Sequence, residues 1–340
     1  MIPLDPDTIR QILNDTDPAR TEALARQAAA LTRQYFGRAR SLYTPLYLSN
    51  YCSGRCVYCG FNHRQPITRI KLCADEIHQE AQTIAQMGIE DILLLTGESY
   101  TATPLSYLIE AVDICKPFFP SIGMEIHALE EDEYRSLFQA GVDSITLYQE
   151  TYDRVRYQEV HLAGRKKDYD FRYHAPERIA AAGVRRISMG VLLGLSDPAQ
   201  DLYALFTHLR RMERMFPGVE YSLSFPRLRG VPDQNFQAIS ISDAQLIKIL
   251  CLARIFFPRT GINLSTRESG QLRNHALHIA ATRLSAASRT SVGGYAADDA
   301  SQRNSQFQVV DHRGVGDVVR FLKDHQFDPV LTDWRRIPNE

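Results

Sequence analysis

Short apolar runs recur along the chain, and most of the intervals between them carry the periodicity of amphipathic helices. Eight runs are candidate strands, and they span residues 44–50, 91–98, 123–129, 144–151, 186–194, 220–227, 262–268 and 283–288. Most are continuous apolar or β-branched runs, as expected of strands that are covered on both faces. The alternation predicts βα units around a parallel sheet.

The ends of the expected helices are marked by capping residues. The first 40 residues have apolar positions three and four apart, and this pattern ends at Gly37, a residue suited to C′. Farther along, Pro176 and Ser242 are expected at the N1 and N-cap positions of two helices. A chain of 340 residues can form two domains or one large barrel. We expect an N-terminal helical extension over 1–40 and an α/β fold, a TIM-type (β/α)8 barrel with a C-terminal closing segment, over 41–340.

Polar or glycine residues stand at the end of nearly every candidate strand. They are Ser49, Asn50, Thr96 to Glu98, His127, Gln149 to Thr151, Gly194, Arg227, Ser265 to Glu268 and Ser285. In a parallel barrel these ends meet on one face, where active sites of this architecture lie. We therefore expect one pocket on that face. Residues 229–240 and 289–306 are rich in turn-forming or polar residues and are expected to be long connections.

Charge and hydropathy narrow the class of partner. The 39 Lys and Arg residues nearly balance the 40 Asp and Glu residues, so no overall field favours nucleic acid or anionic lipid. A small-molecule ligand is therefore expected. The sequence does not start with a basic segment followed by an apolar one, and no run of eighteen apolar residues occurs. These features predict a cytoplasmic protein.

Three of the six cysteines lie close together, directly after the first candidate strand. Cys52, Cys56 and Cys59 have the spacing C-x3-C-x2-C. Thiolates are natural ligands of iron–sulfur clusters, and three ligands on four irons leave one iron open for a cofactor. Structural zinc is the alternative, but it requires four closed ligands, and only His63 is suitably spaced to complete them. Simple packing of buried cysteines is the second alternative.

The segment PLYLSNYCSGRCVYCGF, residues 45–61, resembles the radical S-adenosylmethionine (radical SAM) superfamily, with Tyr58 in its aromatic position. The motifs LLLTGE, YQETY, GLSD, YSLSFPRLR, LSTRES and GGY are similar in order and spacing to the 2-iminoacetate synthases, a family of tyrosine lyases. This likeness runs from about Arg33 to Trp334. The segment RLRGVPDQNFQ after the sixth candidate strand departs from the family pattern.

The resemblance implies a specific reaction. Such enzymes hold a [4Fe-4S] cluster and S-adenosyl-L-methionine, cleave the latter to methionine and a 5′-deoxyadenosyl radical, and break the Cα–Cβ bond of L-tyrosine. The products are 2-iminoacetate (dehydroglycine) and p-cresol, and 2-iminoacetate supplies the thiazole moiety of thiamine. Thiazole synthase is the implied protein partner, and a flavodoxin or ferredoxin is the implied electron donor.

Two other functions stay open beside this one. A radical SAM lyase of the same fold could act on another aromatic amino acid such as tryptophan. A non-catalytic scaffold could use the cysteines only to bind metal. The tyrosine lyase of hydrogenase maturation is not expected, because it carries a second cysteine cluster in a C-terminal extension, whereas this sequence has no cysteine after Cys251.

The resemblance also assigns cofactor-binding residues. Cys52, Cys56 and Cys59 are the cluster ligands, and Tyr58, Thr96, Gly97, Glu98, Gln149, Glu150 and Arg172 are assigned to S-adenosylmethionine. The segment Thr96 to Glu98 is expected to bind its amino group, and Arg172 its carboxylate. Gln149 and Glu150 are expected to accept hydrogen bonds from ribose hydroxyls or an ammonium group. Structural alternatives are a strand-to-helix turn for the first segment, a helix cap for Gln149 and Glu150, and solvated surface charge for Arg172.

The substrate is assigned to the seventh strand and its end. A guanidinium matches a carboxylate in two-point contact, so Arg267 is expected to bind the tyrosine carboxylate, supported by a hydrogen bond from Ser265. Glu125 and His127 alternate on the third strand and point into the barrel in this likeness. They are weaker candidates, because satisfied polar groups of the core show the same pattern.

Overall fold

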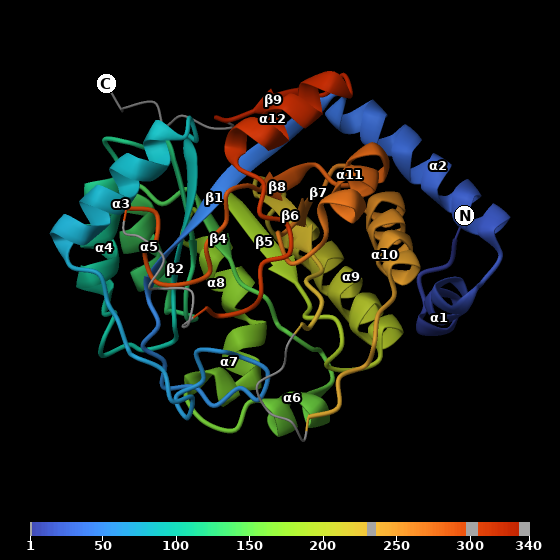
Figure 1. Ribbon diagram of the computed structural model, residues 1–340. Coiled ribbons are helices and arrows are strands. Elements are labelled where there is room, and N and C mark those ends of the chain that lie inside the picture. Colours follow the sequence, from blue (N-terminus) through green and yellow to red (C-terminus); the bar gives the residue numbers. More distant parts are fainter. Residues whose placement is uncertain (1, 230–235, 297–304, 333–340) are drawn as a thin grey trace.

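The computed structural model describes residues 2–229, 236–296 and 305–332, and its centre is a closed parallel β-barrel (Figure 1). The strands are β1 (Ala39–Ser49), β2 (Asp91–Thr96), β3 (Ser121–Glu125), β4 (Ser144–Thr146), β5 (Arg186–Gly190), β6 (Glu220–Ser224), β7 (Gly261–Leu264), β8 (Arg283–Ser285) and β9 (Asp328–Val330). Strands β1 to β8 pair in sequence order, and β1 closes the barrel by pairing with both β2 and β8.

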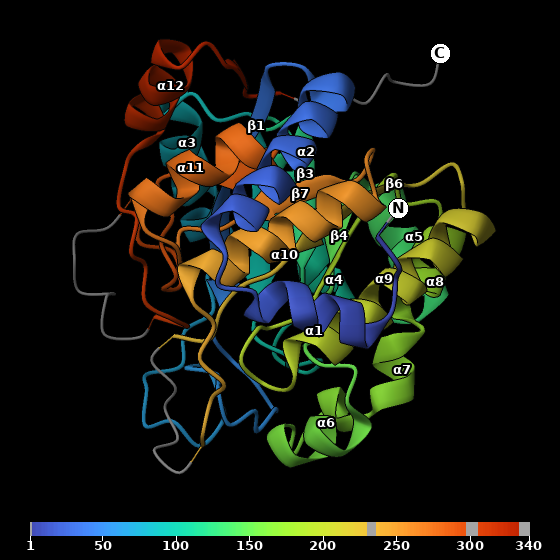
Figure 2. The same ribbon diagram turned by 90° about the vertical axis from the view of Figure 1, so that its right-hand side faces the viewer.

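Helices surround this barrel. They are α1 (Pro6–Asn14), α2 (Pro18–Phe36), α3 (Ala74–Gln86), α4 (Leu105–Cys115), α5 (Glu131–Ala140), α6 (Arg154–Val160), α7 (Tyr169–Tyr173), α8 (Ala175–Ala181), α9 (Pro198–Met215), α10 (Asp243–Phe256), α11 (Gly270–Ile279) and α12 (Val315–Asp324), with a short 3₁₀ helix, η1 (Arg165–Lys167). In both views α2 and α12 lie at one end of the barrel, and α6 and α7 lie at the other (Figures 1 and 2).

The predicted (β/α)8 barrel is confirmed, and each of the strands β1 to β8 overlaps one of the eight predicted runs. All six residues of β2 are buried, as expected of a strand with the barrel interior on one face and helices on the other. Gly37 ends α2 with a φ of 55°, in the left-handed region that favours glycine. Ser242 caps α10 by accepting a hydrogen bond from the Gln245 amide.

Two details of the expected elements are wrong. The predicted strands run too far at their carboxyl ends: β4, for example, ends at Thr146, and Gln149 and Glu150 lie in the following loop. The apolar pattern continues beyond the hydrogen-bonded ladder because these loops still line the inside of the barrel mouth. Pro176 occupies the second position of α8, since the helix begins at Ala175 and His174 is its N-cap.

The N-terminal helices and the C-terminal segment cover the outside and the base of the barrel. Lys248 of α10 donates a hydrogen bond to the Asp15 carbonyl after α1, and Thr32 of α2 donates one to the Ile279 carbonyl. Strand β9 pairs with the first residues of β1, at the amino end of the barrel. None of the described helices combines the length and the apolar character that crossing a membrane requires. Trp334 and parts of the connections 229–240 and 289–306 lie outside the described residues.

Candidate functional site

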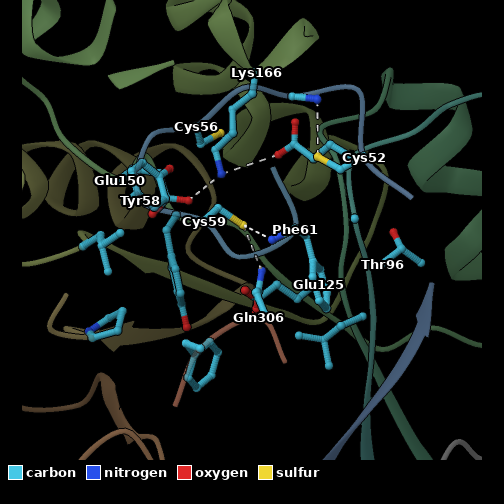
Figure 3. A pocket seen from close by; sticks show the side chains of 18 of the residues that line it. Cys52, Cys56, Tyr58, Cys59, Phe61, Thr96, Glu125, Glu150, Lys166 and Gln306 are labelled. Carbon is cyan, nitrogen blue, oxygen red and sulfur yellow. Dashed lines mark hydrogen bonds and ion pairs between the residues drawn. The ribbon is translucent and has the colours of Figure 1, made fainter. Parts of the chain in front are cut away.

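The three clustered cysteines line one pocket at the carboxyl end of the barrel strands (Figure 3). None of them forms a disulfide. The Gly54 amide lies 3.3 Å from Cys52 Sγ, and the Phe61 amide lies 3.4 Å from Cys59 Sγ, so backbone N–H groups already point at two of the sulfur atoms. Burial raises the pKa of the Cys52 thiol to about 11. The raised pKa means that forming the Cys52 thiolate costs free energy at neutral pH, and metal binding would have to offset this cost.

Glycines let the cysteine loop approach its neighbours closely. A Cβ at Gly54 would lie 3.3 Å from the sulfur of Cys52 and 3.7 Å from that of Cys56, so the glycine leaves room between the thiols. A Cβ at Gly97 would lie 2.3 Å from the carbonyl oxygen of Tyr51. Such a distance is impossible for a real side chain, so only glycine allows the end of β2 to approach this loop.

Two carboxylates and two cations form an ionic cluster beside the thiols. Lys166 Nζ lies 2.7 Å from Glu150 and 3.6 Å from Glu98, and Arg172 Nη1 lies 3.0 Å from Glu98. The side chains come from η1, α7 and the loops after β2 and β4, and Figure 3 shows Lys166 reaching toward Glu150. Burial raises the pKa of Glu98, but the charges of Lys166 and Arg172 outweigh it and leave that pKa below its ordinary value.

Tyr58, between two of the cysteines, is held by a buried histidine. Its hydroxyl lies 2.8 Å from His161 Nε2, and His161 Nδ1 lies 2.8 Å from the carbonyl oxygen of Tyr157. A carbonyl can only accept, so Nδ1 carries the proton and Tyr58 donates to Nε2. Burial lowers the pKa of His161, which favours this neutral form. The phenol is thereby fixed on the wall of the pocket.

An inner chamber within the barrel shares part of its wall with this pocket. It is lined by aromatic and aliphatic side chains, by six serine and threonine residues, by one cation, Arg267, and by one carboxyl group, Glu125. Arg267 lies over the Phe307 ring with its guanidinium carbon 3.4 Å from the ring centroid. No hydrogen bond or ion pair joins the Glu125 carboxyl group to another described residue. Burial and the neighbouring Glu150 raise its pKa to about 7.

The structure brings most of the predicted site residues together. The pocket or its inner chamber is lined by Cys52, Cys56, Tyr58, Cys59, Thr96, Gly97, Glu98, Glu150, Arg172, Ser265 and Arg267. The buried Thr96 hydroxyl has no hydrogen-bond partner among the described residues, so it is available to a ligand. Ser265 Oγ lies 3.4 Å from the Arg267 amide.

Two predicted residues point elsewhere. The Gln149 side chain is buried and donates to the carbonyl oxygen of Tyr169, at 3.5 Å, and it is not part of the pocket wall. His127, one of the weaker candidates, is buried against the Tyr100 ring, with 3.9 Å between the ring centroids. Assignment of Gln149 to the cofactor therefore stays a prediction.

Sequence reasoning misses several residues of the pocket. Lys166 stands in a basic segment whose cations are expected to be solvated, yet it bonds to Glu150 inside the pocket. In sequence, Gln306 and Phe307 only end or follow a polar connection, whereas in the structure they line the pocket, with Gln306 Nε2 3.9 Å from Cys59 Sγ. No local pattern marks these residues, because their place depends on how distant loops fold over the barrel.

The donor set fits a cluster and a zwitterionic cofactor. Three free thiols in one short loop, with backbone N–H groups directed at two of them, match the ligands and outer hydrogen bonds of an iron–sulfur cluster. The adjacent cluster of two carboxylates and two cations can meet an ammonium and a carboxylate group. For zinc, His63 does not supply the fourth ligand, because it is exposed and does not line the pocket that the three cysteines share. In the parts of the chain that the structure describes, no three His, Cys, Asp or Glu side chains are grouped around a single-ion site.

Comparisons with known proteins agree with this site. Residues 46–209 match the Radical SAM superfamily, and residues 224–328 match the Biotin and Thiamin Synthesis associated domain. The chain is 37% identical over 329 residues to 2-iminoacetate synthase of Escherichia coli (strain K12), which covers 96% of this chain and 87% of that protein. The Salmonella typhimurium enzyme of that name is 36% identical, covering 97% and 88%.

A solved structure is similar over nearly the whole chain. It is the FeFe-hydrogenase maturase HydG from Carboxydothermus hydrogenoformans, with a TM-score of 0.89 and 32% sequence identity. The match covers 96% of this chain and 76% of that chain. About a quarter of that maturase therefore has no counterpart in the match.

Proposed function

This chain belongs to the radical SAM superfamily and, within it, to the 2-iminoacetate synthase family, and on that basis we propose that it is a lyase that cleaves the Cα–Cβ bond of L-tyrosine. The products are 2-iminoacetate and p-cresol. The observation that supports the proposal is a pocket with three free thiols and an ionic cluster, next to an inner chamber with aromatic side chains and a single guanidinium that shares part of its wall.

The outer part of the pocket is assigned to the cofactors. Cys52, Cys56 and Cys59 would ligate a [4Fe-4S] cluster, which, with S-adenosylmethionine bound, supplies the radical chemistry. Glu98 offers a carboxylate to the cofactor ammonium group, and Arg172 offers a guanidinium to its carboxylate. Arg172 and Cys56 are each 5% exposed, so these two side chains have little contact with bulk water.

The inner chamber suits an aromatic amino acid. Arg267 provides the two-point contact for a carboxylate, and its stacking on Phe307 fixes the plane of the guanidinium. Tyr43, Tyr47 and Leu93 give apolar surface for the substrate ring. The Glu125 carboxyl group lies in the wall shared by the chamber and the outer pocket, where it can accept a proton from the substrate ammonium group.

The biological context follows from the product. 2-Iminoacetate hydrolyses readily, so an enzyme that uses it should receive it directly, and we propose thiazole synthase as that partner in thiamine biosynthesis. We also propose a flavodoxin or ferredoxin as electron donor. All six cysteines are free thiols, which fits the reducing cytoplasm that we propose as the location.

An anaerobic assay tests this function. The reconstituted and reduced protein is incubated with S-adenosylmethionine and tyrosine, and 5′-deoxyadenosine, p-cresol and glyoxylate are measured. All three products are expected. Deoxyadenosine without p-cresol would retain the radical chemistry but move the substrate to tryptophan or another amino acid. If protein with a full cluster forms neither deoxyadenosine nor p-cresol, the proposal is overturned and a metal-binding scaffold is favoured.

A further inference from the structure

The outer surface of the cysteine loop is basic. Residues 50–74 contain Arg55, Arg64, Arg69 and Lys71 but no aspartate or glutamate. Arg69 donates to the carbonyl oxygens of the loop itself, and Lys71 donates to a carbonyl oxygen as well. No ion pair joins any of these four side chains to a described carboxylate. The positive charge of this segment is therefore not neutralised within the described structure, although the whole chain is nearly neutral.

A second segment adds to the same surface. The Arg55 amide donates to the Ala163 carbonyl at 3.2 Å, and the Leu162 amide donates to the Arg55 carbonyl at 3.0 Å. Gly164 then lies against Gly54, because a Cβ on Gly164 would be 2.9 Å from the Gly54 Cα. The next turn, η1, presents the exposed cation Lys167 beside the loop.

Apolar side chains occupy the same surface. Tyr51 is 40% exposed and Leu162 is 39% exposed, so both are among the few large apolar side chains that reach solvent. Tyr51 is bonded directly to Cys52, and Leu162 pairs with the loop that joins Cys52 to Cys56. Apolar contacts within a charged rim are typical of protein–protein interfaces.

This surface lies directly over the thiols. Cys52 and Cys59 are only partly buried. Three partly or fully exposed residues are direct neighbours of a cysteine in the sequence, namely Tyr51, Ser53 and Arg55. An electron carrier docked here would therefore lie close to any group that the cysteines hold. In both views the segment after β1 lies at the same end of the barrel as α6 and α7 (Figures 1 and 2).

We infer that the basic rim of Arg55, Arg64 and Lys167 around Tyr51 and Leu162 is the docking surface for a small acidic protein that carries one electron at a time. The inference rests on the proposed function, because that function requires such a donor. One electron would leave the reduced carrier, and the cluster that Cys52, Cys56 and Cys59 would hold would accept it. Charge complementarity selects an acidic carrier, and a modest apolar centre suits a short-lived complex.

The experiment reverses the charge of rim residues that do not line the pocket. Arg64 and Lys167 are exposed and neither lines the pocket, so the Arg64→Glu/Lys167→Glu double variant is the test. The matched control is Arg33→Glu/Lys323→Glu, which changes the net charge equally on α2 and α12 at the opposite end of the barrel. Each protein is checked for iron content and visible absorbance. Deoxyadenosine formation is then measured with dithionite and with reduced acidic flavodoxin.

The expected result separates the two reductants. With flavodoxin, the half-saturating donor concentration of the test variant rises by about tenfold, because reversing rim charges mainly slows association. With dithionite, the test variant equals wild type, and the control variant equals wild type with both. Direct binding of flavodoxin, measured by biolayer interferometry without S-adenosylmethionine, weakens to the same extent. Added salt weakens wild-type binding but not the dithionite rate.

Several outcomes would overturn the inference. One is an unchanged response to flavodoxin in the test variant, and another is wild-type binding that salt does not affect. If the test variant loses binding to thiazole synthase and keeps binding to flavodoxin, the surface belongs to that other partner. Should the double variant be unstable, Arg64→Gln/Lys167→Gln and the wild-type salt series give the same comparison. If wild type forms no deoxyadenosine with dithionite, the proposed function fails instead.

Discussion

Arg172 and Glu98 form an ion pair of 3.0 Å that joins α7 to the loop after β2. The Arg172 side chain is 6% exposed and that of Glu98 is 17% exposed, and Arg172 also donates from Nε to the carbonyl oxygen of Tyr148 at 2.7 Å. This single guanidinium therefore fixes the relative positions of two strand ends that form the outer pocket. Lys166 supplies a second cation to the same carboxylate at 3.6 Å.

Replacing Arg172 by Gln should weaken S-adenosylmethionine binding by about 10- to 100-fold, since a buried charge loses its partner and the cofactor carboxylate loses its cation. Lys166→Gln should act in the same direction through Glu150. Equilibrium dialysis with labelled S-adenosylmethionine measures both effects. Arg154→Gln is the control, because its pair with Asp170 is exposed. Unchanged binding by Arg172→Gln would contradict the cofactor role.

Replacing Cys52, Cys56 or Cys59 by Ala should remove the cluster and abolish deoxyadenosine formation. Each change removes one of three ligands, and two thiolates cannot hold a [4Fe-4S] cluster securely. Iron content, the visible spectrum and deoxyadenosine measure the loss. Cys73→Ser is the control, because Cys73 is exposed and serine retains an N-capping side chain for α3. Retained turnover in any of the three variants would disprove the ligand assignment.

Arg267→Lys should lose most of the tyrosine lyase activity while it retains cluster binding. Lysine carries the charge but cannot form a two-point contact with a carboxylate or stack flat on Phe307. The KM for tyrosine should rise by about 10-fold or more, and deoxyadenosine should be formed without matching p-cresol. Arg289→Lys, at an exposed position outside the pocket, should behave like wild type. Coupled product formation with an unchanged KM would remove Arg267 from the substrate site.

The activity should rise with pH through about 7 because of Glu125. Burial raises its pKa to about 7, so this carboxyl group becomes able to accept a proton only when the pH passes that value. The kcat/KM for tyrosine, measured with dithionite between pH 6 and 8.5, should show the inflection in wild type. Glu125→Gln should lower kcat/KM and flatten its pH profile. Glu110→Gln, an exposed position on α4, should leave kcat/KM and its pH profile unchanged.

Stability should have the opposite dependence on pH in this window. The folded pKa of Glu125 lies above the ordinary value of 4.5, so the folded state keeps a proton that the unfolded state releases. The contribution of this group is therefore fully present below about 4.5 and is lost as the pH rises through about 7. Glu125→Gln should remove that part of the pH dependence in urea unfolding. An inflection that persists in the variant, in activity or in stability, would have another origin.

Gly97→Ala should destabilise the protein and hinder cluster assembly. The new Cβ would lie 2.3 Å from the Tyr51 carbonyl oxygen, so either β2 or the cysteine loop must move. Overpacking against backbone typically costs about 1–3 kcal/mol of unfolding free energy. Urea unfolding and iron content measure the two effects. Gly218→Ala is the control, because a Cβ at Gly218 would have no neighbouring atom of the described residues within 4 Å. Equal stability of both variants would show that the loop has more freedom than this contact indicates.

The sequence by itself determined the barrel and its metal-binding motif. Alternation of apolar runs with amphipathic helices is a local property, and a parallel barrel is one of few ways to bury such a series. The three cysteines lie within eight positions, so their proximity needs no tertiary information. Strand-end residues such as Glu98 and Arg267 are predictable for a related reason, since parallel strands bring all their carboxyl ends to one face.

Only the tertiary structure decided which of the remaining polar residues meet in the pocket. Lys166 and Lys167 are neighbours in one basic segment, and no local pattern distinguishes Lys166, which bonds to Glu150, from Lys167, which faces solvent. Gln149 and Glu150 are neighbours, yet one turns to the Tyr169 carbonyl and the other to Lys166. The physical reason is that periodicity fixes which face of a strand a residue occupies, whereas beyond the strand each side chain takes its direction from partners that lie far away in the chain.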